Sequence, residues 1–440
     1  MEESNLVRAR SSIVWILAIV CAFAAVWWIE RNSGKQLIAS GPVLAASPDL
    51  PAEPAPRALT ERERQWARIA WAYFEKNANA QTGLVNSVDN FGSTTMWDAA
   101  SSLMALLAAR DLALVDAVAF DARLSLALQS LARIPLYANA LPNKAYDVAT
   151  LAMTDYDNKP APQGIGWSAI DLGRLIVPLN VIVWRHPQHT AAARAVIARW
   201  DTKQLARDGL LLGMEVRPGA AAQSVQEGRG GYEQYAARTL ALMGVDADRA
   251  ADPLTYLRLV DVGGVKICAD NRSEKEGART FITSDPYVLA GMELGFGRSL
   301  RECAWRLYRA QEARHRKSGV LTAVGEDNVD RAPWFVYNTA HSGGRDWVAL
   351  TEKGEDASAL RSLSVKSAFG WHALYRTPYT TQLVEAVAGL HDPARGWYAG
   401  LYEEGRATNK SLTANTNAVV LESLAYIARG RLLSWREATP

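Results

Sequence analysis

The chain has 440 residues and a formal net charge of +2, so it lacks the basic excess by which nucleic-acid-binding proteins attract phosphates. About half of the residues are hydrophobic and a fifth are charged, which is typical of a globular protein with a sizeable core. The fifteen tryptophans are an unusual number, and flat indole faces that meet polar groups are what sugar-binding sites use.

The N-terminal segment predicts a membrane anchor. Residues 12–29 form an uncharged apolar run, just long enough to cross a bilayer core of roughly 30 Å. Arg8 and Arg10 precede the run, and Trp27 and Trp28 lie at its far end, where indoles favour the headgroup layer. A cleaved signal peptide is the alternative, but small residues suited to cleavage come late, so we favour an uncleaved, single-pass inner-membrane anchor.

A stretch rich in Ala and Pro follows the anchor, and we interpret it as a stiff spacer that holds a domain away from the membrane. Of the three cysteines, Cys21 lies in the apolar run. Cys268 and Cys303 could form a disulfide if the domain is exported to the periplasm, although their spacing does not decide this.

Beyond residue 59, amphipathic segments alternate with segments that are apolar around most of their circumference. The amphipathic candidates are 60–77, 119–133, 188–205, a weak one at 254–262, 300–316 and 379–391. The apolar candidates, expected to be buried on most sides, are 95–109, 166–183, 231–243, 286–296, 365–375 and 414–428. Six outer–inner pairs predict an all-α fold, an (α/α)6 toroid, preceded by one transmembrane helix. The expected regions are 1–35 for the cytoplasmic tip and anchor, 36–58 for the linker and 59–435 for the toroid.

The links between these helices differ in length. Links from inner to outer helices are short, whereas most links from outer to inner helices are long, such as 134–165, 206–230, 317–364 and 392–413. The long links should therefore emerge on one rim, at the N-termini of the inner helices. Long loops on a rigid scaffold are where function usually lies.

This rim collects carboxylates and aromatic residues, which suits a glycan-binding cleft. Glycoside cleavage needs one carboxylic acid as proton donor and a second carboxylate as base or nucleophile. The predicted catalytic residues are Glu227, taken as the general acid, with Asp98 or Glu403 as the second carboxylate. The predicted substrate-binding residues are Trp97, Trp167, Tyr232, Glu326, Asp327, Trp334, Tyr337, Trp397 and Tyr402.

Simpler interpretations stand beside these. Asp98 in a first turn is also what a helix dipole favours, and Asp285 before Pro286 is interpreted as a helix cap. Charged loop pairs such as Glu326-Asp327 are often ordinary solvated groups. No phosphate-binding loop, dinucleotide fingerprint, nucleophile elbow or zinc motif occurs, so we expect no cofactor and no metal.

Seven segments resemble the bacterial family named domain of unknown function 3131. They are TTMWDAASSLMAL, GIGWSAIDLGRL, QEGRGGYEQYAAR, TSDPYVLAGMELG, VYNTAHSGGRDW, RGWYAGLYEEG and TANTNAVVLESLAY, and the resemblance runs over residues 59–430. The family is similar to glucoamylase-like bacterial proteins, which include β-1,2-glucan hydrolases with (α/α)6 toroids. The resemblance implies a toroid and an envelope glycan context, but it assigns no catalytic residue.

The expected function is that of a periplasm-facing glycoside hydrolase or transglycosylase acting on an envelope or exported β-glucan-like polysaccharide. The main alternative is a non-catalytic, glycan-binding accessory of a polysaccharide synthase or export complex. A lyase or epimerase acting on a uronic acid polymer is a third reading, which His341 and Arg345 support weakly. A carboxylate pair at the rim favours hydrolysis, and a lone acid among aromatics favours binding.

Overall fold

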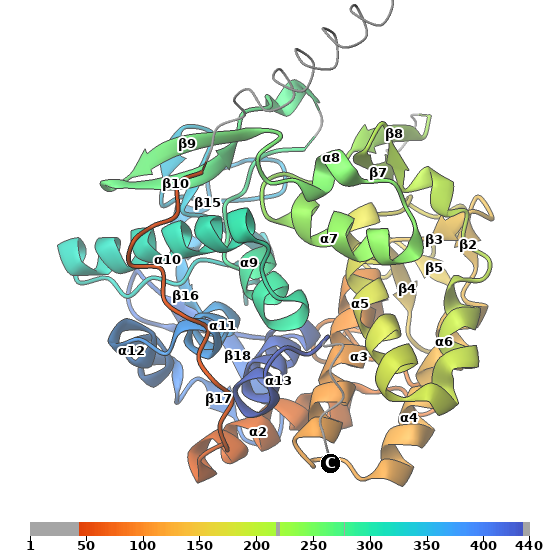
Figure 1. Ribbon diagram of the computed structural model, residues 1–440. Helices are drawn as coiled ribbons and strands as arrows, with labels where there is room; N and C mark the ends of the chain where they lie inside the picture. Colours follow the sequence, from red (N-terminus) through yellow and green to blue (C-terminus); the bar gives the residue numbers. More distant parts are fainter. Residues whose placement is uncertain (1–43, 217–220, 277, 434–440) are drawn as a thin grey trace, which may run out of the picture. The chain divides into compact units, whose positions relative to one another are not determined.

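The structure is a computed structural model that describes residues 44–216, 221–276 and 278–433 (Figure 1). The chain divides into two units, Met1–Ala45 and Ala46–Pro440, and the fold below concerns the second. None of the described helices is long and apolar enough to cross a bilayer. The predicted anchor at residues 12–29 lies outside the described residues.

Six inner helices form a closed ring. They are α3 (Met96–Asp111), α5 (Ala169–Arg185), α7 (Tyr232–Leu240), α9 (Asp285–Leu289), α11 (Val365–Tyr375) and α13 (Ala414–Arg429). Each packs against the next in this order, and α13 packs against α3 to close the circle. The helices are buried almost all round, as their apolar composition predicts.

Outer helices cover the ring. They are α2 (Glu61–Asn77), α4 (Ala117–Arg133), α6 (Thr190–Ile197), α8 (Asp248–Ala251), α10 (Arg298–Ser318) and α12 (Pro378–Val387). The helix α2 begins at a capping box in which Thr60 accepts from the backbone N–H of Glu63 and the Glu63 carboxylate accepts from that of Thr60. The alternation of inner and outer helices confirms the toroid predicted from the helix pairs.

The prediction of a weak outer helix at 254–262 was wrong. This segment forms a hairpin of β9 (Leu257–Val262) and β10 (Val265–Asp270), and the outer helix of this pair is the single turn α8. The turn residues Gly263 and Gly264 both have positive φ, which two-residue hairpin turns require and which glycine adopts freely. The Gly263-Gly264 pair therefore indicated a hairpin more strongly than the apolar periodicity indicated a helix.

The long connections are not purely loops, so the all-α expectation was incomplete. They contain short antiparallel sheets: β1 (Ser93–Thr95) with β4 (Ala145–Asp147) and β5 (Met153–Thr154), β6 (Ala206–Arg207) with β7 (Leu210–Glu215) and β8 (Gln223–Gln226), and β11 (Glu326–Asn328) with β12 (Phe335–Asn338) and β15 (Ala349–Leu350). A further sheet joins β16 (Ser362–Ser364), β17 (His391–Asp392), β18 (Gly396–Tyr402) and β19 (Thr408–Leu412), and two-stranded pairs form from β2 (Leu136–Tyr137) with β3 (Leu141–Pro142) and β13 (His341–Ser342) with β14 (Arg345–Asp346). Strands this short show too little alternation to be read from sequence.

Part of the predicted spacer is bound to the toroid. Figure 1 shows the red to orange chain before α2 running past α10 and α11. Along residues 46–58, the backbone N–H of Ser47 donates to Glu302 at 2.9 Å, and Arg57 forms an ion pair with Glu63 at 2.7 Å. We call residues 46–58 the strap. Its contacts place the start of the folded unit near Ala46 rather than near residue 59.

A buried ionic centre ties the inner helices together. Arg174 on α5 is fully buried and pairs with Glu422 on α13 at 2.9 Å and with Glu293, in the π-helical turn Ala290–Leu294 that continues α9. Tyr235 on α7 donates to Glu293 at 2.5 Å. One guanidinium faces two carboxyl groups, and burial raises the pKa of Glu422 well above its usual range although Arg174 opposes the shift.

Candidate functional site

The N-terminal ends of the inner helices share one face of the ring, which we call the mouth. Each long connection leads from an outer helix to the start of the next inner helix, so its last residues lie at this face. Six carboxyl groups lie here, connected by charge interactions that act on Asp171, Glu326 and Asp327, and we call them the acid cluster: Asp98, Asp171, Glu227, Asp285, Glu326 and Asp327. Close carboxylates of this kind mark functional sites more often than structural ones.

Glu227 is held at the start of α5. Its Oε2 atom accepts from the backbone N–H of Ala169 at 2.5 Å and, more weakly, from that of Ile170 at 3.4 Å. The backbone of Glu227 is fixed as well, because its N–H donates to the carbonyl of Leu211. Burial raises the pKa of Glu227, although nearby Lys144 and these donors oppose the shift.

Asp171 lies in the first turn of the same helix, three residues after the N-cap Ser168. Burial raises the pKa of Asp171 to about 7, and the negative charge of Glu227 adds to the shift. Lys144, in the connection before α5, lowers the pKa of both groups. Burial thus opposes the ionisation of both carboxyl groups, and the pKa of Asp171 lies near neutral pH.

A second part of the acid cluster lies at the starts of α9 and α11. Lys366, 2% exposed, pairs with Asp285 at 2.8 Å and with Asp327 at 3.6 Å. Asp285 also accepts from the backbone N–H of Glu326 at 3.0 Å. Burial, together with the charge of Asp285, raises the pKa of Glu326 to about 8, and burial raises that of Asp327 to about 6. Two further carboxyl groups thus ionise near neutral pH.

Asp98 is the first-turn acid of α3. Its carboxylate accepts from the hydroxyl of Thr95 at 2.8 Å, and the Thr95 Oγ1 atom in turn caps the helix. Burial raises the pKa of Asp98, while the hydrogen bonds from Ser87 and Thr95 oppose the shift. The residue is both a helix-capping group and a member of the acid cluster, since its charge also raises the pKa of Asp171.

Aromatic side chains surround the acids. Trp97 packs edge-on against Tyr232, with ring centres 6.0 Å apart, and Trp167 packs in the same way against Tyr137 at 5.7 Å. The indole N–H groups of Trp97 and Trp167 are buried and have no hydrogen-bond partner in the structure. Buried donors seldom remain unsatisfied, so these two are candidates to donate to sugar hydroxyl groups.

Two tyrosines lie within electrostatic range of the acid cluster. Tyr156 is 54% exposed, and its hydroxyl is within electrostatic range of Asp171 and Glu227. Tyr337 is half-buried and stacks on Phe281, with the ring centres 3.9 Å apart. It is within electrostatic range of Glu326. Polar tips and flat apolar faces around carboxyl groups are what a saccharide ligand requires.

The structure brings seven of the predicted site residues together at the mouth and adds three more. The seven are Asp98, Glu227, Glu326, Asp327, Trp97, Tyr232 and Tyr337. The additional ones are Asp171, Asp285 and Lys366. The sequence signal for Lys366 was a single lysine within an otherwise apolar inner helix, which only a paired charge tolerates. Trp167 immediately precedes the N-cap of α5.

Glu403 lies apart from the acid cluster, as a structural anion. It accepts two hydrogen bonds from Arg314, at 2.6 and 2.8 Å, and pairs with Arg361 at 2.6 Å. Burial tends to raise the pKa of Glu403, but the two guanidinium groups outweigh it and leave the pKa below its usual range. A permanently ionised carboxylate whose oxygens are both bound by arginines is poorly suited to proton transfer.

Three predicted sugar-binding aromatics have other environments. Trp397 is fully buried and donates to the carbonyl of Trp66 in the core. Tyr402 is 3% exposed and donates to Asp330 at 2.7 Å. Neither presents a ring face to a ligand. Trp334 is 63% exposed in the turn between β11 and β12, which follows Glu326 along the chain.

No metal-binding group was found in the part of the chain that the structure describes, where no three His, Cys, Asp or Glu side chains are arranged to hold an ion. His341, the residue that a lyase reading would use, is 7% exposed and forms a 2.6 Å contact with Asp346.

A family model described as "Protein of unknown function (DUF3131)" matches residues 65–430 and confirms the resemblance carried by the seven segments. No curated protein sequence matches the chain.

Several solved structures share the fold. An endo-β-1,2-glucanase from Chitinophaga pinensis, in complex with sophorotriose and glucose, has a TM-score of 0.61 and 11% identity, with 85% of this chain and 94% of that chain covered. An endo-β-1,2-glucanase from Talaromyces funiculosus with sophorose has a TM-score of 0.57 and 12% identity over 84% of each chain. A candidate glucoamylase from Bacteroides fragilis has a TM-score of 0.61 and 12% identity, with 87% and 94% covered. At this identity the likeness shows a common (α/α)6 fold.

Proposed function

We propose that this chain, which belongs to the DUF3131 family, is a glycoside hydrolase or transglycosylase that acts on a β-glucan-like polysaccharide at the mouth of its toroid. The observation that carries the proposal is the Asp171–Glu227 pair. One member keeps a proton to about pH 7 because burial and the charge of the other oppose its ionisation. Acid–base cleavage of a glycosidic bond requires two carboxyl groups in these two protonation states.

The electrostatics favour a different assignment from the sequence-based hypothesis, in which Glu227 was the general acid and Asp98 or Glu403 the second carboxylate. We take Glu227 as the ionised member, because its charge adds to the burial that raises the pKa of Asp171, and because the backbone N–H groups at the start of α5 stabilise its anion. We therefore assign Asp171 as the proton donor and Glu227 as the ionised partner. Glu326, with its pKa near 8, is a second protonated carboxyl group beside them.

In the proposed reaction, Asp171 gives its proton to the bridging glycosidic oxygen as the bond from that oxygen to the anomeric carbon breaks. Glu227 takes a proton from the hydroxyl group that attacks this carbon. The attacking group is water in hydrolysis and a sugar hydroxyl in transglycosylation. Protons and charges balance, and the two carboxyl groups return to their starting states when they exchange protons with solvent.

The substrate proposal draws on the mouth and on the solved relatives. Tyr156 is exposed and Tyr337 half-buried near the acids, and the buried indole N–H groups of Trp97 and Trp167 have no hydrogen-bond partner among the described residues. The endo-β-1,2-glucanases with the same fold hold sophorose or sophorotriose, short β-1,2-linked glucose chains. A β-1,2-glucan is therefore the first substrate to test.

We place the protein in the inner membrane with its toroid in the periplasm. The apolar run at residues 12–29 supports an anchor, and the Cys268–Cys303 disulfide supports an oxidising compartment. Removal of residues 1–35 should release the toroid from the membrane fraction. A C-terminal fusion to an enzyme that is active only after export should be active, and an inactive fusion would refute the periplasmic assignment.

The decisive experiment incubates the wild-type protein with β-1,2-, β-1,3- and β-1,4-glucans and measures both the release of reducing ends and the binding of each glucan. Glu227→Gln should reduce release by orders of magnitude, whereas Glu404→Gln, at an exposed residue next to Glu403, should not. Binding of a glucan without any release by the wild type would instead support the accessory role. Full activity of Glu227→Gln would remove Glu227 from the mechanism.

The assignment of roles has its own test. Aryl glycosides with good leaving groups need little protonation, so Asp171→Asn should lose much less activity on them than on the natural glucan. Glu227→Gln should lose activity on both kinds of substrate. The opposite pattern would restore Glu227 as the proton donor.

A further inference from the structure

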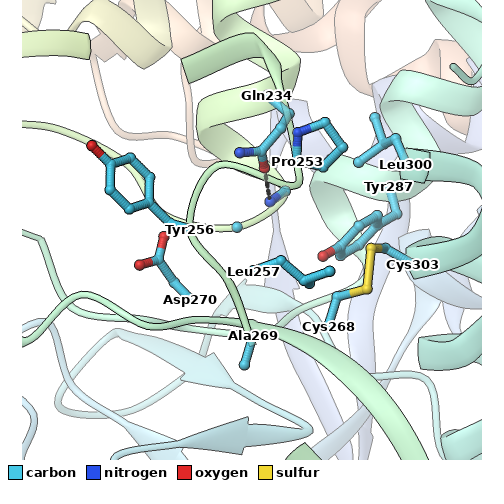
Figure 2. Close-up of a pocket in the computed structure, with 12 residues that line it drawn as sticks. Gln234, Pro253, Tyr256, Leu257, Cys268, Ala269, Asp270, Tyr287, Leu300 and Cys303 are labelled. Carbon is cyan, nitrogen blue, oxygen red and sulfur yellow. Dashed lines mark hydrogen bonds between the residues drawn. A yellow bond between two sulfur atoms is a disulfide. The ribbon is translucent and has the colours of Figure 1, made fainter. Parts of the chain in front are cut away.

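A small pocket lies behind the loop that carries Glu227, between the start of α7, the β9–β10 hairpin and α10. Figure 2 shows its lining, with the Cys268–Cys303 disulfide beside Tyr287, and Tyr256 and Asp270 at the other side. Its volume, about 20 Å³, is the space of a single water molecule, too little for a sugar. The significance of this region therefore lies in the side chains that connect it to Glu227.

Arg272 is the centre of that connection. Its side chain is 5% exposed, and it joins two buried carboxylates that come from different elements. It pairs with Asp270, at the end of β10, through two hydrogen bonds of 3.0 and 2.5 Å. It also pairs with Glu233, which is fully buried in the first turn of α7. The guanidinium lies over the ring of Tyr256 at 3.8 Å, which fixes its plane.

Glu233 connects Arg272 to the loop before α7. Its Oε1 atom accepts from the side-chain amide of Gln226 at 2.9 Å. The same amide nitrogen donates to the backbone carbonyl groups of Glu227 at 2.8 Å and Gly228 at 3.2 Å. Gln226 therefore links the carboxylate of Glu233 to the backbone of Glu227 through hydrogen bonds.

The disulfide holds the far end of the connection. It joins Cys268 of β10 to Cys303 of α10, and Asp270 follows two residues after Cys268 on the same strand. The strand is therefore covalently attached to an outer helix close to the carboxylate that orients Arg272. The series from the disulfide to Glu227 runs through buried or half-buried groups at every step.

We propose that Arg272 is a positioning residue for Glu227, acting through Glu233 and Gln226, with the Cys268–Cys303 disulfide as the fixed point. The proposal rests on the proposed function for the role of Glu227 in the reaction, but the positioning itself does not. Arg272 touches neither the acid cluster nor any group at the mouth among its recorded contacts. A displacement of about 1 Å at a reacting group costs about a hundredfold in rate, so a loosened Glu227 should slow the reaction without weakening substrate binding.

The test compares Arg272→Ala and Gln226→Ala with Arg279→Ala. The last variant is the control, because it also removes an arginine that forms an ion pair and it lies in the same connection between β10 and α9. Arg279 pairs only with the exposed Glu274 among the recorded ion pairs. Gln226→Ala is included because it leaves the Arg272–Asp270–Glu233 group intact, so it should fold even if Arg272→Ala does not. For both test variants, kcat on the glucan should fall about 10- to 100-fold with KM within about twofold. Arg279→Ala should behave like the wild type.

A double-mutant cycle separates positioning from a general loss of structure. If Arg272 acts only through Glu227, combining Gln226→Ala or Arg272→Ala with Glu227→Gln should reduce kcat no further than Glu227→Gln alone. Independent, multiplying losses would overturn the proposal. So would an unchanged kcat in the folded Gln226→Ala variant.

A measurement without substrate keeps this proposal distinct from the proposed function. Backbone amide exchange of residues 226–233 should be faster in Gln226→Ala, and in the double variant Cys268→Ala/Cys303→Ala, than in the wild type. Exchange in α2, on the other side of the ring, should be unchanged. If the wild type cleaves no glucan while exchange changes as described, the hydrolase proposal fails and the positioning remains. If exchange in 226–233 does not change, the positioning proposal fails.

Discussion

Gly213 on β7 lies directly against the carboxylate of Glu227. A Cβ atom at Gly213 would be 3.0 Å from both the Cδ and the Oε2 atoms of Glu227, closer than ordinary van der Waals contact. The φ angle of Gly213 is not in the left-handed region, so the backbone conformation does not require a glycine at this position. It makes room for the carboxylate beside the first turn of α5.

This contact gives the first prediction. Gly213→Ala should displace the Glu227 carboxylate by a few tenths of an ångström and weaken its bond to the N–H of Ala169. We expect kcat to fall roughly tenfold, with little change in the thermal midpoint, because the three atoms nearest to the added methyl group all belong to this side chain. Steady-state kinetics and thermal unfolding measure both effects. An equal fall for Gly297→Ala, where a Cβ meets nothing within 4 Å, would show that the effect is not specific.

The charge of Lys144 should influence the pH above which activity declines. Asp171 acts in its protonated form, so activity should decline as pH rises through its pKa, about 7. The positive charge of Lys144 favours the ionised form and lowers this pKa. Lys144→Met should therefore move the descending limb of the kcat/KM profile to higher pH. Lys159→Met, which removes an exposed lysine paired with Asp157, should leave the limb where it is. A shift to lower pH would contradict the proposed role of Asp171.

Glu403 should matter for stability and not for chemistry. Glu403→Gln leaves Arg314 and Arg361 without their anion, which should cost about 2–4 kcal/mol in the free energy of unfolding, while kcat stays within about twofold. Because the folded-state pKa is lowered, the stabilisation is present above the ordinary glutamate pKa of about 4.3. It is lost as pH falls through the lower, folded-state value. The stability difference between wild type and variant should thus shrink in acid, as denaturant unfolding at several pH values would show. A large loss of kcat in the folded variant would return Glu403 to the list of catalytic candidates.

The buried centre of the ring predicts an asymmetry between two substitutions. Burial raises the pKa of Glu422 well above its usual range, so we expect Glu422→Gln, which puts a neutral group of similar shape in its place, to change stability by about 1 kcal/mol or less at pH 7. Arg174→Met leaves Glu293 without its cation and should cost at least about 3 kcal/mol. Chemical denaturation tests both. Equal, large losses for the two variants would mean that Glu422 is ionised in the folded protein.

The strap predicts where the folded unit begins. A chain that starts at Leu59 loses the partners of Glu302, Arg301 and Arg431 along the outside of the ring, and it should unfold at a lower temperature than a chain that starts at Ala46. Its glucan cleavage below the unfolding transition should be unchanged, because no strap residue has a recorded contact with the acid cluster. Equal unfolding temperatures would show that the spacer interpretation of residues 46–58 was adequate.

The sequence by itself determined the helix pairs, their order and the face at which the long connections meet. These follow from short-range regularities: apolar residues repeat with the helical period, and loop length is read directly from the chain. The same reasoning failed at the β9–β10 hairpin, where a Gly-Gly turn changed the local structure, and at the short strands of the connections.

Only the tertiary structure decided which acids act together. Glu227 and Glu403 look alike in sequence, each in a loop rich in glycine or charge. Yet Glu227 lies at the start of α5 within electrostatic range of Asp171, whereas Glu403 binds two arginines. The pKa of a carboxyl group depends on the distances to charges and donors and on the exclusion of water. Those quantities arise between residues far apart in the chain, so no local pattern encodes them.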